Sequence, residues 1–385
     1  MSVAKIAREL SLEEIGGNPP PPEPSGAHSV TDLILGLPSM VDQLDLVTLD
    51  PNIQETHEYR GERVRLAAGP YRTRIRTMSK DLFRDERSFI AEKLRDWQPD
   101  VAGAHWTYEF ALGLLDSGIP HLITVRDWAP TVLWSMRDPY RAVRLYMQFL
   151  TFARGSNFAA VSPYMARRVE RVTRRSVAVV PNGIGDAWLA AVHDAEPGSN
   201  VLAINHGFDR RKNVRRLLSD WPKVAERVPG TLLHLVGHGF EEDGPAHHWS
   251  AGKQLAQDVM FHGPVSRAEL PEMLKKTKVF VHPSLEESFG MTVLEAMASG
   301  VPVVGGAKSG AIPWLLSSGA GVLVDVKTPG AIADGVVRIL RDSDYGQQVA
   351  AAGRARAHEF ALEQVAESYM NSLSAVAGGR HGLAP

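Results

Sequence analysis

Short apolar runs separated by segments of helical periodicity constrain the fold of this chain more than any other feature. A first series consists of LDLVTL at residues 44–49 and further runs at 100–106, 120–128, 157–162 and 177–183. A second series of six runs lies between residues 200 and 325, and amphipathic segments such as RKNVRRLLSDWPKVAERV separate them. Strands buried on both faces of a parallel sheet have this appearance. The sequence therefore predicts an α/β protein with two parallel sheets.

The domain boundary is expected between the two series of runs. A length of 385 residues suits two domains better than one core. GDAWLAAVHDAEPGSN, which starts at Gly185, is a connector of polar and small residues. We expect a Rossmann-like N-terminal domain over 1–186, a linker over 187–200 and a Rossmann-like C-terminal domain over 201–358, followed by an amphipathic tail over 359–385. Because open α/β sheets bind ligands at the carboxyl ends of their strands, two such domains facing each other would place substrates in a cleft.

The N-terminal segment has one low-complexity stretch, GGNPPPPEPSG at residues 16–26. Consecutive prolines favour an extended, solvated loop. The residues that follow, AHSVTDLILGLPSM, have apolar positions at helical spacing, so the loop is expected to open a helix ahead of the strand LDLVTL. The stretch VAKIARELSL before the loop fits either a helix or a first strand.

Charge is distributed unevenly along a chain whose formal net charge is only -2. Residues 1–55 hold two basic and nine acidic side chains, whereas residues 56–180 hold 21 basic and 13 acidic ones. The basic region includes YRTRIRT and MARRVERVTRR. These stretches are either solvated faces of ordinary elements or a rim that attracts an anionic acceptor or an anionic lipid surface.

The chain contains no cysteine, which excludes disulfides and a cysteine nucleophile and fits a reducing compartment. The N-terminus does not resemble a secretory leader, and no uncharged run approaches the ~18 residues of a membrane-spanning helix. We therefore expect a cytoplasmic protein whose contact with a membrane, if it has one, is peripheral.

The segment HPSLEESFGMTVLEAMASGVPVV carries the strongest functional signal. An apolar strand ends near His282, a loop contains Glu287, and a helix that begins near Met291 contains Glu295 in its second turn. The amide groups at a helix start are unpaired and carry a partial positive charge, and Gly290 permits close approach of a ligand to the backbone. The sequence therefore predicts a phosphate site at this helix start.

Two carboxylates beside a phosphate site require groups that donate hydrogen bonds to them. Ionised carboxylates only accept hydrogen bonds, so Glu295 would suit the hydroxyls of a ribose and Glu287 those of a second sugar. Together they indicate a nucleotide sugar. Taken alone, Glu287 would be better interpreted as a solvated loop residue and Glu295 as an exposed helix residue.

Several segments resemble those of the retaining GT-B glycosyltransferases of family 4. Glu287 and Glu295 are separated by seven residues within PSLEESFGMTVLEAMASGVPVV, as in the family signature. FDRRKNVRRLL resembles the donor-phosphate segment, with Lys212 in the place of the family's lysine. LHLVGHG, FHGPVS and VPNGI stand where the family has LxxVGxG, a base-binding FxGxV turn and a PNG segment. The resemblance extends from about residue 100 to residue 340.

This resemblance implies a metal-independent, retaining transfer of a sugar from a UDP- or GDP-linked donor to an acceptor hydroxyl. The first domain would bind the acceptor, the second the donor, and the tail over 359–385 would cross back to the first domain. Glu287 would contact donor hydroxyls rather than act as a nucleophile, which its position alone leaves open. The implied residues are Lys212, Glu287 and Asp127 for catalysis; Arg211, Lys212, Gly263, Val265, Glu287, Phe289, Gly290, Met291, Thr292 and Glu295 for the donor; and Gly17, Gly26, His105 and Arg126 for the acceptor or N-terminal loop.

The sequence departs from the family pattern at two places. His206 and Gly207 occupy the positions before Lys212 where the family has an arginine, and Arg210 or Arg211 is the candidate replacement. Arg126 stands where histidine is common. The alternatives are therefore a glycan phosphorylase or sugar-nucleotide epimerase on the same fold, and a nucleotide-sugar-binding regulator without catalysis.

Four further patterns carry no function in this interpretation. VGHGFEE lacks the third glycine of a dinucleotide fingerprint, and GGAKSG lacks the glycine required before the lysine of a phosphate loop. The acidic triplet DSD at 342–344 is expected to be solvated. The histidines lack zinc-protease spacing, and His234, His238, His247, His248 and His262 are expected in packing or surface roles.

Overall fold

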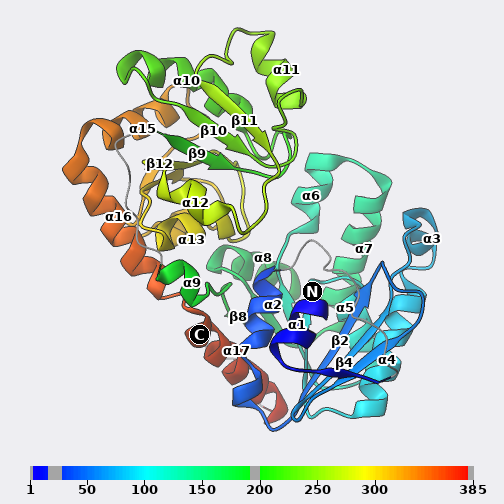
Figure 1. The fold of residues 1–385 in the computed structure, drawn as a ribbon. Helices are drawn as coiled ribbons and strands as arrows, with labels where there is room; N and C mark the ends of the chain where they lie inside the picture. Colours follow the sequence, from blue (N-terminus) through cyan, green and yellow to red (C-terminus); the bar gives the residue numbers. More distant parts are fainter. Residues whose placement is uncertain (1–2, 16–27, 191–199, 380–385) are drawn as a thin grey trace. The chain divides into compact units, whose positions relative to one another are not determined.

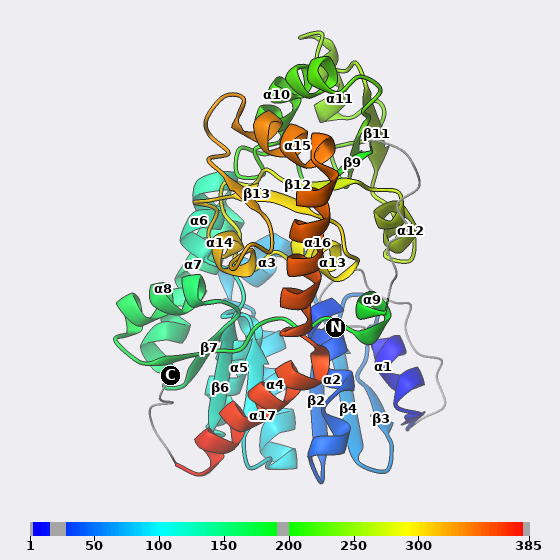
Figure 2. The same cartoon turned by 90° about the vertical axis from the view of Figure 1, so that its left-hand side faces the viewer.

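The computed structural model describes residues 3–15, 28–190 and 200–379 (Figures 1 and 2). It divides into two compact units: unit 1 contains the chain up to Gly183 together with the residues from Leu362 onward, and unit 2 contains Ile184 to Ala361. The division therefore falls a few residues before the predicted end of the first domain at residue 186. Most of the predicted linker, residues 191–199, lies outside the described residues.

Unit 2 is built on one parallel sheet with the strand order β11-β10-β9-β12-β13-β14. In chain order within this unit, that arrangement is 3-2-1-4-5-6, the order of a doubly wound nucleotide-binding fold. The order reverses between β9 and β12, which pair in parallel. The six strands are β9 (Val201–Ile204), β10 (Leu233–Val236), β11 (Val259–Gly263), β12 (Val279–His282), β13 (Val303–Gly306) and β14 (Val322–Val324).

The main core of unit 2 lies between one face of this sheet and the helices α10 and α15 (Figure 1). Alternate strand residues such as Val279 and Val281 enter this core with Trp221 of α10 and Val336 of α15. Helix α13 packs against α16 and contacts β12 and β13. The helices are α9 (Asp186–Leu189), α10 (Val214–Arg227), α11 (Pro245–Ala251), α12 (Leu270–Lys275), α13 (Met291–Ala298), α14 (Ile312–Leu315), α15 (Ala331–Arg341) and α16 (Ser343–His358).

The acidic triplet at 342–344 has a structural role in this unit. The Asp342 side chain caps α16 by accepting a hydrogen bond from the amide of Tyr345, and Asp344 lies in the first turn, where negative charge is favourable. The expectation of a solvated role is consistent with these contacts. Within the described ranges, no group of three or more potential metal ligands gathers.

Unit 1 contains two four-stranded sheets rather than the one doubly wound sheet expected from the sequence. The order β5-β6-β7-β8 is fully parallel, whereas β1-β3-β4-β2 is mixed because β3 pairs antiparallel with both β1 and β4. The runs at 57–60 and 64–70 were not predicted as strands, because charged residues interrupt their apolar pattern. The strands are β1 (Glu13–Glu14), β2 (Leu44–Asp50), β3 (His57–Arg60), β4 (Val64–Pro70), β5 (Ala102–His105), β6 (His121–Val125), β7 (Phe158–Ala160) and β8 (Val177–Val179).

The helices of unit 1 include the last helix of the chain. Residues 3–9 form a helix, so the alternative of a first strand there is wrong. The helices are α1 (Val3–Glu9), α2 (His28–Leu35), α3 (Ile75–Lys80), α4 (Arg84–Trp97), α5 (Glu109–Ser117), α6 (Ala129–Met136), α7 (Pro139–Arg154), α8 (Pro163–Thr173) and α17 (Leu362–Ala377), with a short 3-10 helix at Pro38–Met40.

Helix α17 packs against β6 and α2, as Figure 2 shows. Tyr369 and Leu373 of this helix join a core cluster with Leu122 of β6. Gly103 on β5 makes this close packing possible, because a Cβ atom there would lie 1.9 Å from the Tyr369 hydroxyl oxygen. Across the described ranges, none of the helices combines the length and the apolar character needed to cross a membrane.

Candidate active site

The carboxyl ends of the central strands of unit 2 surround a pocket of about 360 Å³. The pocket lies where the strand order reverses between β9 and β12, the position at which doubly wound sheets bind ligands. Strand ends, loops and the start of α13 all contribute to it. Its lining consists of residues 204–206, 236–238, 264–265 and 290–292, with Lys212, Leu270, His282 and Glu287.

Lys212 and Glu287 form an ion pair in this pocket. The Lys212 Nζ atom lies 2.6 Å from Glu287 Oε1, and the two side chains are 12% and 15% exposed. His282 Nε2 lies 3.4 Å from the same carboxylate oxygen. Burial opposes ionisation of Glu287, but Lys212 and His282 outweigh it and hold the pKa of this carboxyl well below its usual range. Glu287 is therefore a carboxylate at neutral pH.

The loop before α10 fixes the position of Lys212. Asp209 Oδ1 accepts hydrogen bonds from the backbone amides of Arg211, at 2.7 Å, and of Lys212, at 3.3 Å. Asn213 has a left-handed backbone conformation, and its side-chain amide donates to the carbonyl oxygens of Pro283 and Val326. These contacts tie the loop to the ends of β12 and β14, so that Lys212 faces the segment that carries Glu287.

Helix α13 begins at the pocket with its first amide groups available to a ligand. Gly290 has φ 108° and provides no side chain to cap the helix. A Cβ atom at Gly290 would also lie 2.8 Å from Ile312 Cδ1, so glycine is required for two reasons. Gly290, Met291 and Thr292 line the pocket. Together with the partial positive charge at a helix start, this arrangement suits an anion.

A second glycine allows two strand ends to approach each other. Gly237 has φ 122°, and a Cβ atom there would lie 1.8 Å from the carbonyl oxygen of Asn205. Its amide donates to the carbonyl oxygen of Gly263 at 2.7 Å. Gly263 therefore supports the turn after β10, whereas Val265 lines the pocket itself. The segments LHLVGHG and FHGPVS thus form one wall.

Besides Gly263, three predicted donor residues do not line the pocket. Phe289 is buried against Trp314 and Phe360, so only its backbone could reach a ligand. The Arg211 guanidinium lies 3.5 Å from the carbonyl oxygen of Glu286. Glu295 is buried, and its Oε1 atom lies 3.5 Å from Arg267 rather than being exposed on the helix surface.

In unit 1, the predicted residue His105 is the last residue of β5, and the predicted residues Arg126 and Asp127 directly follow β6. Two nitrogens of the Arg126 guanidinium lie 3.2 and 3.1 Å from His105 Nδ1, and Arg126 donates to the side-chain oxygen of Asn182. Burial lowers the pKa of Arg126 to about 10. Burial and the nearby positive charge of Arg126 hold the pKa of His105 well below its usual value, so this histidine is neutral.

A tyrosine holds the carboxylate of Asp127. The Tyr108 hydroxyl lies 2.9 Å from both carboxylate oxygens of Asp127. Burial and the charge of Asp127 raise the pKa of Tyr108, so the tyrosine remains a hydrogen-bond donor. The predicted loop residues Gly17 and Gly26 lie outside the described residues.

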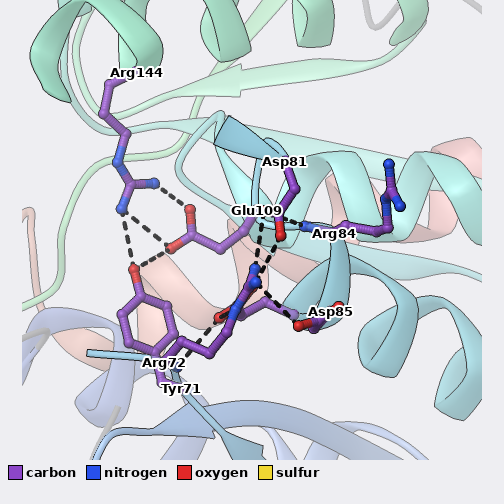
Figure 3. Close-up of polar contacts among 8 residues, drawn as sticks. Tyr71, Arg72, Asp81, Arg84, Asp85, Glu109 and Arg144 are labelled. Atoms are coloured by element: carbon purple, nitrogen blue, oxygen red, sulfur yellow. Dashed lines mark hydrogen bonds and ion pairs between the residues drawn. The ribbon is translucent and has the colours of Figure 1, made fainter. Parts of the chain in front are cut away.

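Part of the basic region of unit 1 is compensated internally (Figure 3). Arg72 forms ion pairs with Asp81 at 2.6 Å, Asp85 at 3.0 Å and Glu86 at 2.6 Å. Arg144 forms an ion pair with Glu109 and lies 3.2 Å from the Tyr71 hydroxyl. These two arginines therefore stabilise the fold and are not part of a rim that attracts anions.

Comparison with known families follows the same division of the chain. The profile described as "Glycosyltransferase Family 4" matches residues 26–188, and the one described as "Glycosyl transferases group 1" matches residues 190–356. The two matches are adjacent and together take in both units. The chain belongs to glycosyltransferase family 4.

Individual relatives of this family 4 protein include enzymes of lipid and polysaccharide synthesis. Phosphatidyl-myo-inositol mannosyltransferase of Mycobacterium tuberculosis is 33% identical over 224 residues, which cover 56% of this chain and 58% of that protein. A lipopolysaccharide core biosynthesis glycosyltransferase of Rhizobium meliloti is 25% identical over 319 residues, covering 75% and 90% of the two chains. The chain thus spans little more than half the length of the mannosyltransferase that it matches.

A solved structure supports the assignment of the fold. Sucrose-phosphate synthase from Thermosynechococcus elongatus superposes with a TM-score of 0.73 at 21% identity, covering 91% of this chain and 93% of that one. At this identity the likeness concerns the fold alone. The two α/β units, of which unit 2 has the nucleotide-binding strand order, are those of the GT-B fold, as the sequence predicted.

Sequence reasoning missed several residues of the pocket in this family 4 chain. Asn205, His206, His238 and His282 line it, and the expectation that His238 has only a packing or surface role is not supported. The available signal was position: Asn205 and His206 directly follow β9, and His238 follows β10 by two residues. Residues at the carboxyl ends of parallel strands are candidates for ligand contact whatever their type.

Proposed function

We propose that the protein is a retaining glycosyltransferase that transfers a sugar from a nucleoside-diphosphate sugar to an acceptor hydroxyl. The observation that supports this best is the Lys212–Glu287 pair, which lies in a pocket beside the open amide groups of α13. A cation and helix amides suit the diphosphate, and an ionised carboxylate suits the hydroxyls of the sugar. Both lie at the strand-order reversal.

In the proposed reaction, the bond between the anomeric carbon and the diphosphate oxygen breaks, and the acceptor oxygen bonds to the same carbon from the same face. The departing phosphate oxygen takes the proton of the acceptor hydroxyl. Negative charge grows on the diphosphate as it leaves, so Lys212 and the α13 amides stabilise the transition state more than the ground state. Glu287 orients the sugar by accepting its hydrogen bonds.

We assign the positive charge that this reaction needs to Lys212 and the α13 amides rather than to a divalent metal. Sugar transfer by the purified protein should therefore continue in an excess of a chelator such as EDTA. Loss of turnover with EDTA, and its recovery with magnesium or manganese, would contradict this assignment.

An anionic or lipid-linked acceptor fits the charges of unit 1. Within the described part of the chain, no carboxylate forms an ion pair with Arg126, whose hydrogen-bond partners include His105, Asn182 and Ser29. An anionic group of the acceptor would supply the missing counter-charge. The names of two relatives refer to phosphatidyl-myo-inositol and to lipopolysaccharide core biosynthesis.

A peripheral contact with the cytoplasmic face of a membrane suits the same unit. Helices α3 and α6 both pack on α7, and between them they expose Ile75 (51%), Trp134 (71%) and Met136 (46%). Exposed cations lie on or next to each of the two helices: Arg74, Arg76 and Lys80 at α3, and Arg137 at the end of α6. Aromatic and aliphatic side chains with surrounding cations are typical of surfaces that bind anionic lipids.

Vesicle sedimentation tests this contact. The protein should bind vesicles of phosphatidylglycerol and phosphatidylcholine, but not pure phosphatidylcholine. The Trp134→Ser change should weaken that binding, whereas Met260→Ser, which alters an exposed residue on β11 of unit 2, should not. Equal binding by the two variants would remove the helices α3 and α6 from consideration.

Donor binding and turnover test the proposed function itself. Calorimetry with UDP- and GDP-linked sugars identifies the donor, and release of the nucleoside diphosphate with an acceptor mixture measures transfer. Binding without turnover would identify a regulator, and turnover that requires orthophosphate would identify a phosphorylase. Retention is read from the anomeric configuration of the product by NMR.

A further inference from the structure

The fixed charges of the pocket lining cancel before any ligand binds. The pocket lining, all of which belongs to the described residues, contains one lysine or arginine, Lys212, and one acidic residue, Glu287. The charged atoms of these two side chains lie 2.6 Å apart. The candidate replacement for a second cation, Arg211, is directed to the carbonyl oxygen of Glu286, and neither Arg210 nor Arg211 lines the pocket. A diphosphate that carries a charge on each phosphate therefore meets a pocket whose remaining ionisable groups are histidines.

His206 and His238 form a pair at the mouth of this pocket. Their ring centroids are 4.8 Å apart with an interplanar angle of 81°. The loops that carry them are joined by a hydrogen bond from the amide of Gly207 to the carbonyl oxygen of His238, at 3.0 Å. His206 is exposed, so its ring nitrogens are accessible to a ligand. Both histidines line the same pocket as Lys212.

The neighbouring residue Asn205 indicates independently that a polar ligand belongs here. Its side-chain oxygen lies 3.4 Å from the Ser284 hydroxyl, whereas its Nδ2 atom is buried and has no hydrogen-bond partner among the described residues. An unpaired buried amide donor is unfavourable. Because Asn205 lines the pocket, a ligand oxygen could satisfy this donor.

We propose that His206 and His238 are the second cationic element of the donor site and bind a diphosphate oxygen when protonated. Asn205 donates a hydrogen bond to the same ligand. This inference rests on the proposed function, because it identifies the group that the donor's diphosphate contacts. It also accounts for the absence of an arginine before Lys212, since two histidines supply the charge that one arginine would have supplied.

The direction of the pH dependence follows from the surroundings of His206. In the unliganded protein, burial and the positive charges of His238, Lys212 and Arg211 lower its pKa. A bound diphosphate raises that pKa, because it favours the protonated ring. Donor affinity is therefore highest at pH values below the pKa that His206 has in the protein without donor. Above that pH the affinity falls by up to about tenfold per pH unit, until the pH exceeds the pKa that His206 has in the donor complex.

Other ionisable groups that face His206 are less suited to the same role. From the loop before α10, Asp209 is held by the amides of Arg211 and Lys212. From the segment after β12, Glu287 keeps its charge because its pKa is far below neutrality. His282 is the other histidine of the lining, but it is buried beside Glu287, so a His282→Gln variant distinguishes its contribution from that of the pair.

Calorimetric titration with UDP-glucose and GDP-mannose at several pH values between about 5.5 and 8.5 tests the proposal. Nucleotide sugars are suitable probes because their phosphates are diesters, which do not titrate in this range. For the better probe, we expect tighter binding at low pH in the unaltered protein and in His282→Gln. The double variant H206Q/H238Q should bind about tenfold more weakly at low pH and show little pH dependence.

Two further variants separate charge from structure. His206→Arg provides a permanent cation, so it should bind the probe about tenfold more tightly than the unaltered protein near pH 8 and lose most of the pH dependence. His234→Gln is a matched control, because His234 lies 2.9 Å from His262 on the same sheet but does not line the pocket. Thermal unfolding confirms that each variant is folded.

The outcomes distinguish this inference from the proposed function. If the probe binds and H206Q/H238Q retains the unaltered affinity and pH profile, the histidine assignment is wrong while the donor site stands. If His206→Arg neither tightens binding nor flattens the profile, the charge argument is likewise overturned. If neither probe binds at any pH, the donor class fails and this inference fails with it.

Discussion

Replacing Lys212 by alanine tests the central feature of the site, because it removes the charge proposed to act in catalysis and leaves Glu287 unpaired. At a separation of 2.6 Å and an effective dielectric constant of about 20, the attraction between the two charges is on the order of 6 kcal/mol. Removal of both charges from water opposes this attraction by several kcal/mol per fully buried ion. The pair therefore contributes little to the free energy of unfolding, although each charge is stabilised by the other.

Two losses are expected in Lys212→Ala, and they have different magnitudes. Turnover should fall by about 10²- to 10³-fold, the usual effect of removing one group that stabilises charge in a transition state. The free energy of unfolding should fall by about 1–3 kcal/mol at neutral pH, because Glu287 remains charged without its partner. The pocket is open to water, which keeps this second loss below the 3–5 kcal/mol typical of a fully buried pair.

The double variant K212A/E287Q separates these two losses. A neutral amide removes the unpaired charge, so most of the stability should return while turnover stays low. Urea denaturation measures stability, and nucleoside diphosphate release measures turnover. Turnover of Lys212→Ala at the level of the unaltered protein would refute the assignment of Lys212, and a stability loss that the added Glu287→Gln change does not relieve would refute the account of the pair.

The pH dependence of the stability difference gives an independent check. The pKa of Glu287 is depressed in the folded protein, so its contribution is present above the unfolded value of about 4.3 and is lost as the pH falls toward the folded pKa. The difference in stability between the unaltered protein and Lys212→Ala should therefore be largest near neutrality and shrink below about pH 4. A difference that grows on acidification would contradict the direction assigned to this pKa.

Three further predictions concern other residues. Gly237→Ala should lower the free energy of unfolding by at least about 2 kcal/mol, because its Cβ would lie 1.8 Å from a carbonyl oxygen. Gly319 has φ 80° and open space around it, so the control variant Gly319→Ala should lose only about 1 kcal/mol. Urea denaturation measures both losses. Asp127→Asn should lower turnover at least about tenfold and leave the calorimetric donor affinity unchanged; an unaltered rate would remove Asp127 from the mechanism. Glu295 does not line the pocket, but the family resemblance assigns it to the ribose. On that assignment, Glu295→Gln should weaken donor binding about tenfold and abolish the preference for ribose over 2′-deoxyribose, and a preference that persists would show that Glu295 does not bind the ribose.

The fold of unit 2 could be predicted from the sequence because its strands are buried on both faces. Such strands give continuous apolar runs, and all six appear in the sheet. The mixed sheet of unit 1 could not be predicted in the same way. Strand β3 (HEYR) is mostly polar and only four residues long, and its antiparallel pairing with β4 depends on register rather than on composition.

The candidate site was predicted in part, and the reason is again physical. Lys212, Glu287 and Gly290 could be predicted because they belong to short segments. Within such a segment, the spacing of residues along the sequence already indicates a loop and the first turns of a helix. Asn205 and His238 become neighbours of the pocket only through the pairing of β9 with β10, which no local pattern specifies. The contact between Glu295 and Arg267 likewise joins residues from separate elements.

The internal pairing of Lys212 and Glu287 also explains why additional cations matter to donor binding. When a diphosphate binds, Lys212 must turn from Glu287 to the ligand, so its net contribution is the difference between two charge interactions. The carboxylate released from Lys212 is compensated only if sugar hydroxyls donate to it. Donor affinity thus depends on both ends of the ligand. Lys212 should therefore contribute less to the affinity for a nucleoside diphosphate without the sugar than to the affinity for the nucleotide sugar. No acid of the pocket lining neutralises His206 and His238 in advance. Their charge should therefore account for a larger share of the affinity for the nucleoside diphosphate.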